Sequence, residues 1–374
     1  MTREEAIKKL HKGLSQKQAA VRRAKTYKGE WYSVNSIFGN DWAMFYVLLG
    51  GREAGKSYSA MRWAVVNKLR RGDKFKFYWF RLTEAATKNL LTGGADKFID
   101  PDIRRKYNVN TFTKGSTIYT YTPEEHETKS GKIIKTKENV QTFCDVLACS
   151  TFYNTKGVGY FDNEFDGEYY IVLDEMNREQ SEKNSFDIVY NFVNLLENVA
   201  RSTKNKIKVV MIGNTLEEAS DILSAFNFIP DEYGRYKLKS KRCVVDYIKP
   251  NEEYKKRRKG TIADILSPDA STFTNEVEID RSLLVNKRSC YYPVAIIKFK
   301  KTKDTWFTLW NNNIVKDYNN EQKQVVAMRR YLDEQYVASS AKSVIDMFDA
   351  RALRYVNLAT FKKFQKQMKL LKKQ

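Results

Sequence analysis

Histidine, cysteine and long apolar runs are scarce in this sequence of 374 residues. Its only histidines are His11 and His126, and its four cysteines do not have the spacing of a zinc site. We therefore expect reduced, structural thiols at Cys144, Cys149, Cys243 and Cys290. No stretch approaches the ~20 apolar residues of a membrane helix, and residues 1–5 are charged where a signal peptide would be apolar. These absences predict an intracellular protein without a membrane partner.

Acidic residues are few relative to basic ones. The chain has 66 lysines and arginines against 45 aspartates and glutamates, a formal net charge of +21. Such a charge predicts a polyanionic partner, most simply nucleic acid, bound largely through its phosphates. Lysines placed only for solubility would be scattered, whereas these cluster in residues 255–259 and in the tail at Lys362, Lys363, Lys366, Lys369, Lys372 and Lys373.

The most specific motif follows the apolar run at residues 47–49 and precedes helix-forming sequence at 58–69. It matches the phosphate-binding loop G-x-x-x-x-G-K-[ST] at every fixed position. Glycines let the backbone wrap a polyphosphate closely, with N–H groups and the helix dipole facing the anion. Lys56 is expected to reach the β- and γ-phosphates and Ser57 to bind Mg²⁺. The predicted nucleotide-binding residues are Gly50, Gly51, Arg52, Glu53, Ala54, Gly55, Lys56 and Ser57.

A second motif lies at the end of the apolar run 169–173, which is typical of a buried parallel strand. Asp174 follows it directly and is expected to lie beside the phosphate loop and hold Mg²⁺. The adjacent Glu175 is placed to polarise an attacking water. Acid pairs after apolar strands are common, but the two motifs in this order favour an ATPase.

Three further polar residues close predicted strands or turns near this site. Arg81 ends the strand at 75–80, where it would sense nucleotide, contact DNA or serve as a surface charge. Asn214 follows the strand at 206–212, and it would either face the γ-phosphate and report its loss to moving parts or cap the next helix. Lys156, in a glycine-rich basic turn, would reach a phosphate of nucleotide or of DNA.

Other segments have more than one interpretation. The strands at 117–122 and 140–149 flank a charged turn at 129–132, which would contact DNA or a neighbouring subunit, or remain a solvated loop. Before the first strand, Trp31 or Tyr32 would offer a platform for adenine, although core packing is the more ordinary use of such aromatics.

Strands alternate with helices in the first part of the chain, as in a parallel α/β sheet. We predict an ATPase domain over residues 1–250, with a helical segment at 1–28, and a basic linker with one short helix over 251–270. Residues 271–374 are expected to form a smaller α+β domain. It would contain antiparallel strands at 294–299 and 306–310 and helices from about residue 321.

The ordered set of motifs resembles a known family. Arginine at the third position of Gly50–Ser57, the acid pair after 171–173, an arginine ending a helix at Arg201 and the strand tip at Asn214 are together similar to viral genome-packaging ATPases. These include large terminase subunits, and the likeness is greatest to the packaging motors of small podoviruses with protein-primed linear genomes. The resemblance implies a P-loop NTPase fold of the ASCE, terminase-like type.

The resemblance also implies roles. Asn214 would couple hydrolysis to movement, and Arg201 would be an arginine finger that a subunit donates to its neighbour's nucleotide, with Lys156 a weaker second candidate acting in trans. Such a finger is worth about 10³ to 10⁵ in rate. The alternative for Arg201 is a cation that stabilises a helix C-terminus.

Implied partners follow from the same resemblance: a homo-oligomeric ring, with a pentamer as the expected size, double-stranded DNA, the capsid portal and a structural RNA. The protein would work in the host cytoplasm, transiently on the procapsid. The second domain would be a vestigial RNase H-type nuclease that binds DNA or portal, because Lys298 stands where the first metal-binding acid is wanted.

The sequence therefore predicts an ATP-driven translocase, using ATP and Mg²⁺, that packages viral double-stranded DNA. Besides a helicase, which no clear aromatic-lined single-strand site favours, two alternatives stay open. One is a large terminase subunit with a live nuclease, which would depend on Asp304 or another carboxylate of the second domain. The other is a nucleic-acid-binding assembly protein whose nucleotide site acts only as a switch.

Overall fold

The computed structural model describes residues 31–39, 41–51, 53–127, 133–156, 165–177, 186–200, 206–214, 221–230, 233–250, 252–266, 283–284, 293–299, 306–310, 314–317 and 341–372. The helix expected before residue 28 lies outside these ranges, as do Arg52 and Arg201. The chain divides into two compact units. One comprises the described residues of 22–216 and 232–276, and the other those of 217–231 and 277–374.

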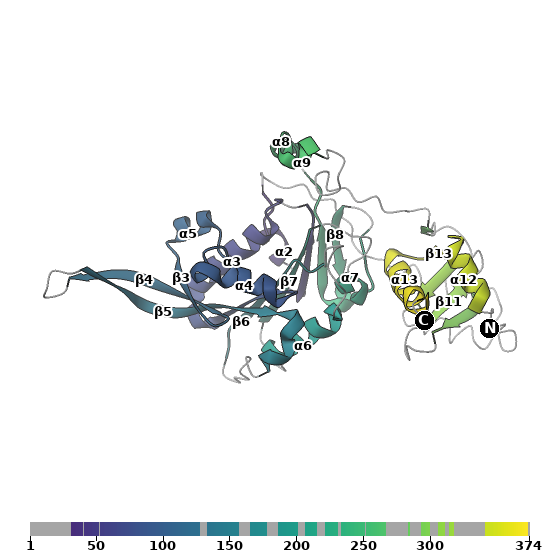
Figure 1. Ribbon diagram of the computed structural model, residues 1–374, viewed down its shortest axis with the longest axis horizontal. Coiled ribbons are helices and arrows are strands. Elements are labelled where there is room, and N and C mark those ends of the chain that lie inside the picture. Colours follow the sequence, from purple (N-terminus) through teal and green to yellow (C-terminus); the bar gives the residue numbers. More distant parts are fainter. Residues whose placement is uncertain are drawn as a thin grey trace. The chain divides into compact units, whose positions relative to one another are not determined.

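The first unit is built on a nine-stranded sheet with the order β3-β4-β5-β2-β6-β7-β1-β9-β8 (Figure 1). The strands are β1 (Phe45–Leu49), β2 (Phe75–Arg81), β3 (Asn110–Lys114), β4 (Thr117–Glu127), β5 (Ile133–Ala148), β6 (Glu168–Asp174), β7 (Lys206–Gly213), β8 (Gly234–Leu238) and β9 (Cys243–Tyr247). In the sheet, the six neighbouring strands β5-β2-β6-β7-β1-β9 all pair in parallel. The remaining pairings, which involve β3, β4 and β8, are antiparallel.

The sheet is therefore mixed, which corrects the expectation of a parallel one. The antiparallel pairs lie at its two edges, and short connections explain two of them. β3 and β4 are joined at Gly115, whose φ is 63°, and β8 and β9 are joined by a single 3₁₀ turn at Lys239–Lys241. A connection of this length permits only antiparallel pairing, because a parallel neighbour needs a crossover of about a dozen residues.

Helices cover both faces of the parallel centre. On one face pack α2 (Asn35–Phe38), α3 (Lys56–Arg71), α4 (Glu84–Ala95) and α5 (Pro101–Tyr107), which share a core cluster with alternate residues of the strands. On the other face lies α6 (Ile188–Ala200), where Phe192 meets Phe80 of β2 edge to face at 6.3 Å. Burial on both faces explains why the central strands are continuous apolar runs: every residue of β6 is buried.

The β4–β5 pair is longer than the sequence predicts. Its two strands remain paired as far as Glu127 and Ile133, and Figure 1 shows them as a ribbon projecting from the sheet. Beyond Thr122 the ribbon is largely exposed, and its hydrophobic residues Ile133 and Ile134 are adjacent rather than alternating with polar ones, so hydrophobic periodicity gives no sign of a strand there. The charged turn predicted at 129–132 lies outside the described residues.

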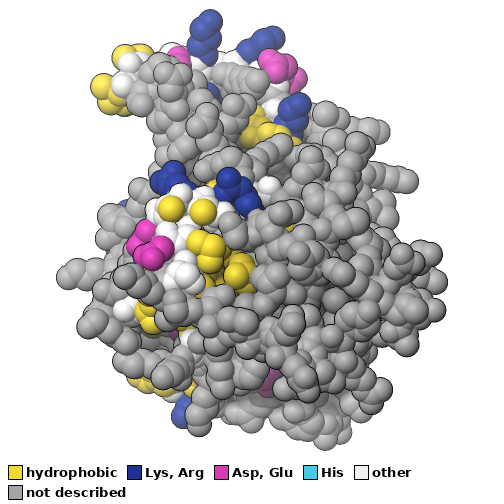
Figure 2. All heavy atoms as spheres, turned by 90° about the vertical axis from the view of Figure 1, so that its right-hand side faces the viewer, with side chains coloured by type: hydrophobic (Ala, Val, Ile, Leu, Met, Phe, Trp, Pro, Cys, Tyr) yellow, Lys and Arg dark blue, Asp and Glu magenta, His cyan; other side chains and the backbone are white. Residues whose placement is uncertain are grey.

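Two short helices, α8 (Glu252–Arg258) and α9 (Ile262–Leu266), occupy the region expected to be a linker with one helix. Both belong to the unit of the nine-stranded sheet. At the top of Figure 2, hydrophobic side chains lie beside lysine and arginine side chains in this region. The hydrophobic ones include Ile262, Ile265 and Leu266, each at least 75% exposed.

The second unit contains a four-stranded sheet, in the order β10-β11-β12-β13. Its elements are α7 (Asp221–Ala225), β10 (Pro293–Lys298), β11 (Trp306–Trp310), β12 (Ile314–Asp317), α12 (Ala341–Asp349), β13 (Arg354–Tyr355) and α13 (Leu358–Lys372). The predicted antiparallel pair β10–β11 is confirmed. Phe307, Tyr355 and Phe364 form the centre of its core, and Lys362 of α13 pairs with Asp221 of α7 at 3.7 Å.

The structure describes three of the four cysteines and most of the predicted helices. Cys144, Cys149 and Cys243 are free and buried, as expected, while Cys290 lies outside the described part. Among the described helices, none has the length and apolar character to cross a membrane.

Candidate functional site

The glycine-rich loop connects β1 to α3, which begins at Lys56. Gly55 caps this helix with φ at 85°, and a Cβ there would lie 3.3 Å from the Trp31 side chain. At Gly50, a Cβ would lie 3.0 Å from Cβ of Ile248. Only glycine fits both positions without strain, so the loop glycines satisfy local packing as well as the need to approach a ligand.

Lys56 is buried and turned back onto its own loop. Its Nζ donates to the backbone oxygens of Gly50 at 2.7 Å and Gly51 at 2.6 Å. Burial lowers the pKa of Lys56 to about 7, and the Asp174 carboxylate offsets only part of that shift. The amine can exchange these carbonyl oxygens for phosphate oxygens, which would stabilise its charged form.

The two motifs found in the sequence are joined by a hydrogen bond. Ser57 Oγ donates to Asp174 Oδ1 at 2.9 Å, although the residues are 117 positions apart. The contact forms because β7 alone separates β6 from β1 in the sheet, so the carboxyl ends of both strands reach the same edge. Burial raises the pKa of Asp174, and the Arg81 guanidinium and the Ser57 hydroxyl oppose that rise.

Arg81 pairs with both acids of the second motif. One guanidinium nitrogen forms an ion pair with Glu175 Oε2, and another lies 3.6 Å from Asp174 Oδ2. Glu175 has a φ of 57°, and its side chain is 59% exposed, whereas that of Arg81 is 14% exposed. The sequence left the use of Arg81 open, and the structure places it in the site because β2 and β6 are parallel neighbours.

Asn214 follows the end of β7, which lies beside β6 as the sequence predicts. Its backbone oxygen accepts a hydrogen bond from Gly50 N at 3.0 Å, so the tip of β7 is joined to the start of the phosphate loop. The residue also lines the pocket described next. Asn214, Lys56, Ser57 and the acid pair are thus brought together at one edge of the sheet.

A pocket of about 420 Å³ opens beside the loop. Its walls comprise Trp31, Glu53, Ala54, Gly55, Lys56, Ser57, Tyr58, Asp100, Asp102 and Asn214. Sequence reasoning missed Asp100 and Asp102, at the start of α5, because nothing in their surroundings marks two acids at a helix N-terminus as part of a site. Trp31 is 45% exposed and forms a π-surface at the pocket wall.

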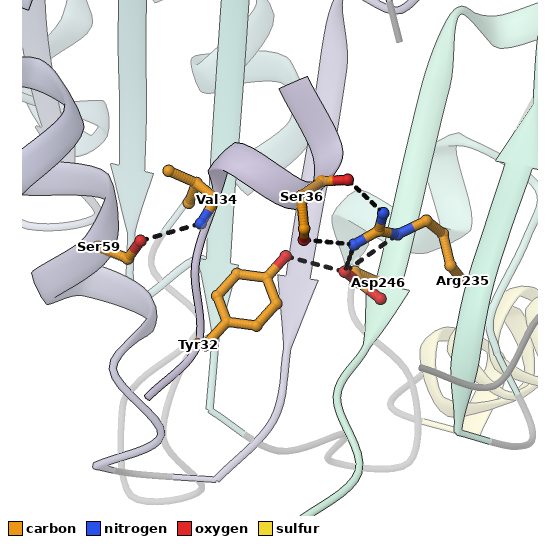
Figure 3. A network of polar contacts seen from close by, with 6 residues as sticks. All are labelled: Tyr32, Val34, Ser36, Ser59, Arg235 and Asp246. Atoms are coloured by element: carbon orange, nitrogen blue, oxygen red, sulfur yellow. Dashed lines mark hydrogen bonds and ion pairs between the residues drawn. The ribbon is translucent and has the colours of Figure 1, made fainter. Parts of the chain in front are cut away.

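A buried polar network fixes the segment that follows Trp31. Figure 3 shows its six members: Tyr32, Val34, Ser36, Ser59, Arg235 and Asp246. Tyr32 donates from its hydroxyl to Asp246 at 2.8 Å, and Arg235 pairs with the same carboxylate. In addition, the Val34 N–H donates to Ser59 Oγ, in the first turn of α3, at 2.9 Å. Tyr32 is consequently a core residue rather than a platform for a base, and the network holds Trp31 and α3 in place.

Lys156, one of the two residues predicted to act in trans, is not among the described residues that line this pocket. Lys156 is exposed at the end of the 3₁₀ segment Cys149–Thr155, and Arg201 lies outside the described residues. The segment before Lys156 is fastened to α6, because Asn198 Nδ2 donates to Thr155 Oγ1 at 3.0 Å. α6 ends at Ala200, immediately before Arg201. Both candidates thus directly follow, in the sequence, two elements that are packed together.

No family model matches the chain, and no curated protein matches it significantly. Among solved structures, the Phi-28 gp11 DNA packaging motor is similar over 89% of this chain and 95% of that chain, at 13% identity and a TM-score of 0.54. The bacteriophage Phi-29 viral genome packaging motor assembly is similar over 91% of this chain and 100% of that chain, at 15% identity and the same TM-score. The chain has the fold of these phage DNA packaging motors.

The likeness to the two packaging motors covers more of the chain than the nine-stranded unit contains, so it includes part of the second unit. A large terminase from a thermophilic bacteriophage, in complex with ADP, aligns over 90% of this chain and 87% of that chain at 12% identity. Its TM-score of 0.38 is too low to support a shared fold. The packaging motors therefore remain the structures on which the comparison rests.

Proposed function

We propose that this protein is an ATPase that drives double-stranded DNA into a viral procapsid. The hydrogen bond between Ser57 and Asp174 is the observation on which this proposal rests. It joins a phosphate-binding loop to the acidic strand expected of a nucleotide hydrolase, in a chain with the fold of phage packaging motors. The site supports the hydrolysis, and the fold supports its use in packaging.

The residues at the loop fit Mg²⁺ and ATP. Mg²⁺ is usually held by one or two protein oxygens together with phosphate oxygens and waters, and Ser57 Oγ and Asp174 Oδ1 supply two oxygens 2.9 Å apart. The metal would neutralise charge on the β- and γ-phosphates. Lys56 would bind the same phosphates, and the remaining loop residues from Gly50 onward would direct backbone N–H groups toward them.

Glu175 is the residue that we assign to water activation. It would accept a proton from the water that attacks the γ-phosphate, so that ADP and inorganic phosphate leave. Its carboxylate pairs with Arg81, so this role requires Glu175 to exchange that partner for water. Asn214, joined to the loop through Gly50, would transmit loss of the γ-phosphate to the rest of the sheet.

Hydrolysis would be completed between subunits of a ring. Lys156 does not line the pocket of its own chain, in keeping with a role in trans, and Arg201 follows the helix to which the Lys156 segment is fastened. We retain Arg201 as the arginine finger and Lys156 as the second candidate. The ring, expected to be a pentamer, would sit on the capsid portal in the host cytoplasm, and a structural RNA would be a further partner.

The second unit would bind DNA or the portal rather than cut DNA. In the described part of α13, Lys366 and Lys369 are exposed, which suits contact with phosphates. We keep the interpretation of this unit as a vestigial RNase H-type domain, although Asp317 is a carboxylate at the end of strand β12. An active nuclease would instead make DNA cleavage depend on carboxylates of this unit.

Steady-state ATP hydrolysis with and without double-stranded DNA tests the proposal. Wild type, Glu175→Gln and Arg201→Ala are compared across protein concentration, alone and mixed. We expect DNA-stimulated turnover that is lost in each variant and partly restored on mixing, because a finger given in trans can pair with an intact carboxylate on a neighbour. ATP turnover that is unchanged by DNA and by Arg201→Ala would contradict the motor and favour the assembly protein with a nucleotide switch.

A further inference from the structure

The basic run at residues 255–259 does not face solvent throughout. Arg258, the last residue of α8, is 7% exposed. Its Nη1 lies 2.9 Å from Oε1 of Glu53, in the middle of the phosphate loop. The sequence predicts that this run is a linker with affinity for polyanions. It does not predict the contact with the loop.

A second arginine of α8 reaches the same loop residue. Arg257 Nη2 donates to the backbone oxygen of Glu53 at 2.9 Å, and the Arg257 guanidinium stacks on the Trp31 ring, 3.7 Å from its centroid. Trp31 and Glu53 both line the pocket. One end of α8 is thus packed against the wall of the candidate nucleotide site.

Glu53 is an unfavourable residue for a loop that binds polyphosphate. It has a φ of 63°, which few residues other than glycine adopt at low cost, and it carries a negative charge where the charges of the phosphates would arrive. The Glu53 side chain is 56% exposed, so it retains partial solvation, whereas the Arg258 side chain is 9% exposed. The charge of Arg258 can therefore cancel the Glu53 carboxylate before any nucleotide binds.

We propose that Arg258 is a positioning residue that neutralises Glu53 and so keeps the phosphate loop receptive to a nucleoside triphosphate. This inference rests on the proposed binding of nucleotide at the loop. It makes α8 part of the nucleotide site, acting through Glu53 rather than by contact with the phosphates. The triphosphate depends on this device more than the diphosphate, because it brings more negative charge.

The test is binding of Mg²⁺ with ATPγS or with ADP to the full-length protein, measured by calorimetry at low salt. Arg258→Gln is expected to weaken ATPγS binding about tenfold, the scale of repulsion between like charges near a protein surface, and ADP binding less. Glu53→Gln should bind ATPγS more tightly than wild type, because it removes a negative charge that repels the phosphates. The double variant Glu53→Gln/Arg258→Gln should recover most of the loss.

The matched control is Lys259→Gln, which removes one exposed positive charge from the same basic run without touching Glu53. We expect it to bind ATPγS as the wild type does. Arg258→Lys keeps the charge and should bind within about twofold of wild type, since an ammonium still pairs with a carboxylate. This variant also provides a test if Arg258→Gln does not fold, as judged by thermal melting.

Two results would overturn the inference. If the double variant binds ATPγS no better than Arg258→Gln, or if Arg258→Lys is as weak as Arg258→Gln, the arginine acts only as a structural anchor for α8. If wild type itself binds neither nucleotide, the proposed function fails at its first step, and this inference fails because it depends on nucleotide binding. If the wild type binds ATPγS and the affinity does not depend on the charge at position 258, the inference alone fails and the proposed function stands.

Discussion

Strand β6 has a buried carboxylate at each end, and the two differ in what surrounds them. Glu168, at the amino end, pairs with Arg71 at 2.6 Å and with Lys208 at 2.5 Å. Asp174, at the carboxyl end, accepts a hydrogen bond from Ser57, and its paired cation, Arg81, is 3.6 Å away. Both side chains are almost inaccessible, at 5% and 11% exposure.

The comparison separates a structural acid from one that can bind a ligand. At Glu168 two cations at close range compensate the buried charge. At Asp174 compensation is incomplete, since burial raises the pKa of that carboxyl against the effect of Arg81, and a pocket opens beside its partner Ser57. A buried carboxylate whose charge is incompletely compensated and that adjoins a cavity is suited to receive a metal ion.

Matched amide substitutions at the two ends of β6 give the largest expected contrast. Asp174→Asn should lower ATP turnover by about a thousandfold, since it removes the proposed metal ligand, and such a metal is worth several kcal/mol of transition-state stabilisation. The same change should raise the melting temperature at pH 7, because a buried acid with a raised pKa destabilises the folded state when it is charged. Turnover and differential scanning calorimetry measure the two effects. Normal turnover in Asp174→Asn would remove Asp174 from the site.

Glu168→Gln should show the opposite pattern. Removing one partner from a buried ion pair costs about 3 to 5 kcal/mol, and the 39% exposure of the Arg71 side chain reduces that figure. We expect a loss of about 2 to 3 kcal/mol in the free energy of unfolding, with turnover per folded protein unchanged. Urea unfolding supplies the first measurement. A fall in turnover without a fall in stability would show that the amino end of the strand also serves the site.

The carboxyl end of β6 was predictable from the sequence, and the reason is burial. Parallel strands covered on both faces are continuous apolar runs, so β1, β6 and β7 stand out, and each is followed by the polar residues of the site. Strand parallelism then brings Ser57 and Asp174 together. The roles of Lys156 and Arg201, by contrast, depend on a second subunit and stay predictions.

Elements stabilised by distant partners were not predictable. β9 contains Asp246, which accepts a hydrogen bond from Tyr32. The two residues are 214 positions apart. The outer half of the β4–β5 ribbon is mostly polar, and its hydrophobic residues Ile133 and Ile134 are exposed, so cross-strand pairing rather than burial defines it. Arg258 appeared in the sequence as one of several basic residues, because nothing local indicates that its partner is Glu53.

The pH dependence of ATP binding tests the positive charge of Lys56. Lys56 has a pKa of about 7 without nucleotide and must be charged to bind phosphate, so binding above pH 7 requires uptake of a proton. We expect affinity to fall by up to about tenfold per pH unit from pH 7 to 9. The nucleotide-free protein should become more stable over the same range, because its folded state binds fewer protons than the unfolded chain.

Calorimetry in two buffers of different ionisation enthalpy measures that proton uptake. Lys68 is a matched internal comparison, since burial also lowers its pKa, but its amine donates to the backbone oxygen of Phe75 and not to the loop. Lys68→Met should therefore leave the pH dependence of binding unchanged. Affinity that is flat between pH 7 and 9 would mean that Lys56 is already charged before ATP arrives.

The smallest expected effect concerns the arginine that pairs with each acid. Arg81 lowers the pKa of Asp174, so Arg81→Gln should raise that pKa further and weaken Mg²⁺ binding in the presence of ADP severalfold at pH 6, with much less effect at pH 8. Arg71→Gln makes the same change beside Glu168 and should leave Mg²⁺ affinity unaltered at both pH values. Titrating Mn²⁺ in place of Mg²⁺ by electron paramagnetic resonance measures the affinity directly. Equal weakening at pH 6 and pH 8 would mean that Arg81 orients the acid pair rather than controlling its protonation, because a change in pKa must fade once the carboxyl is ionised.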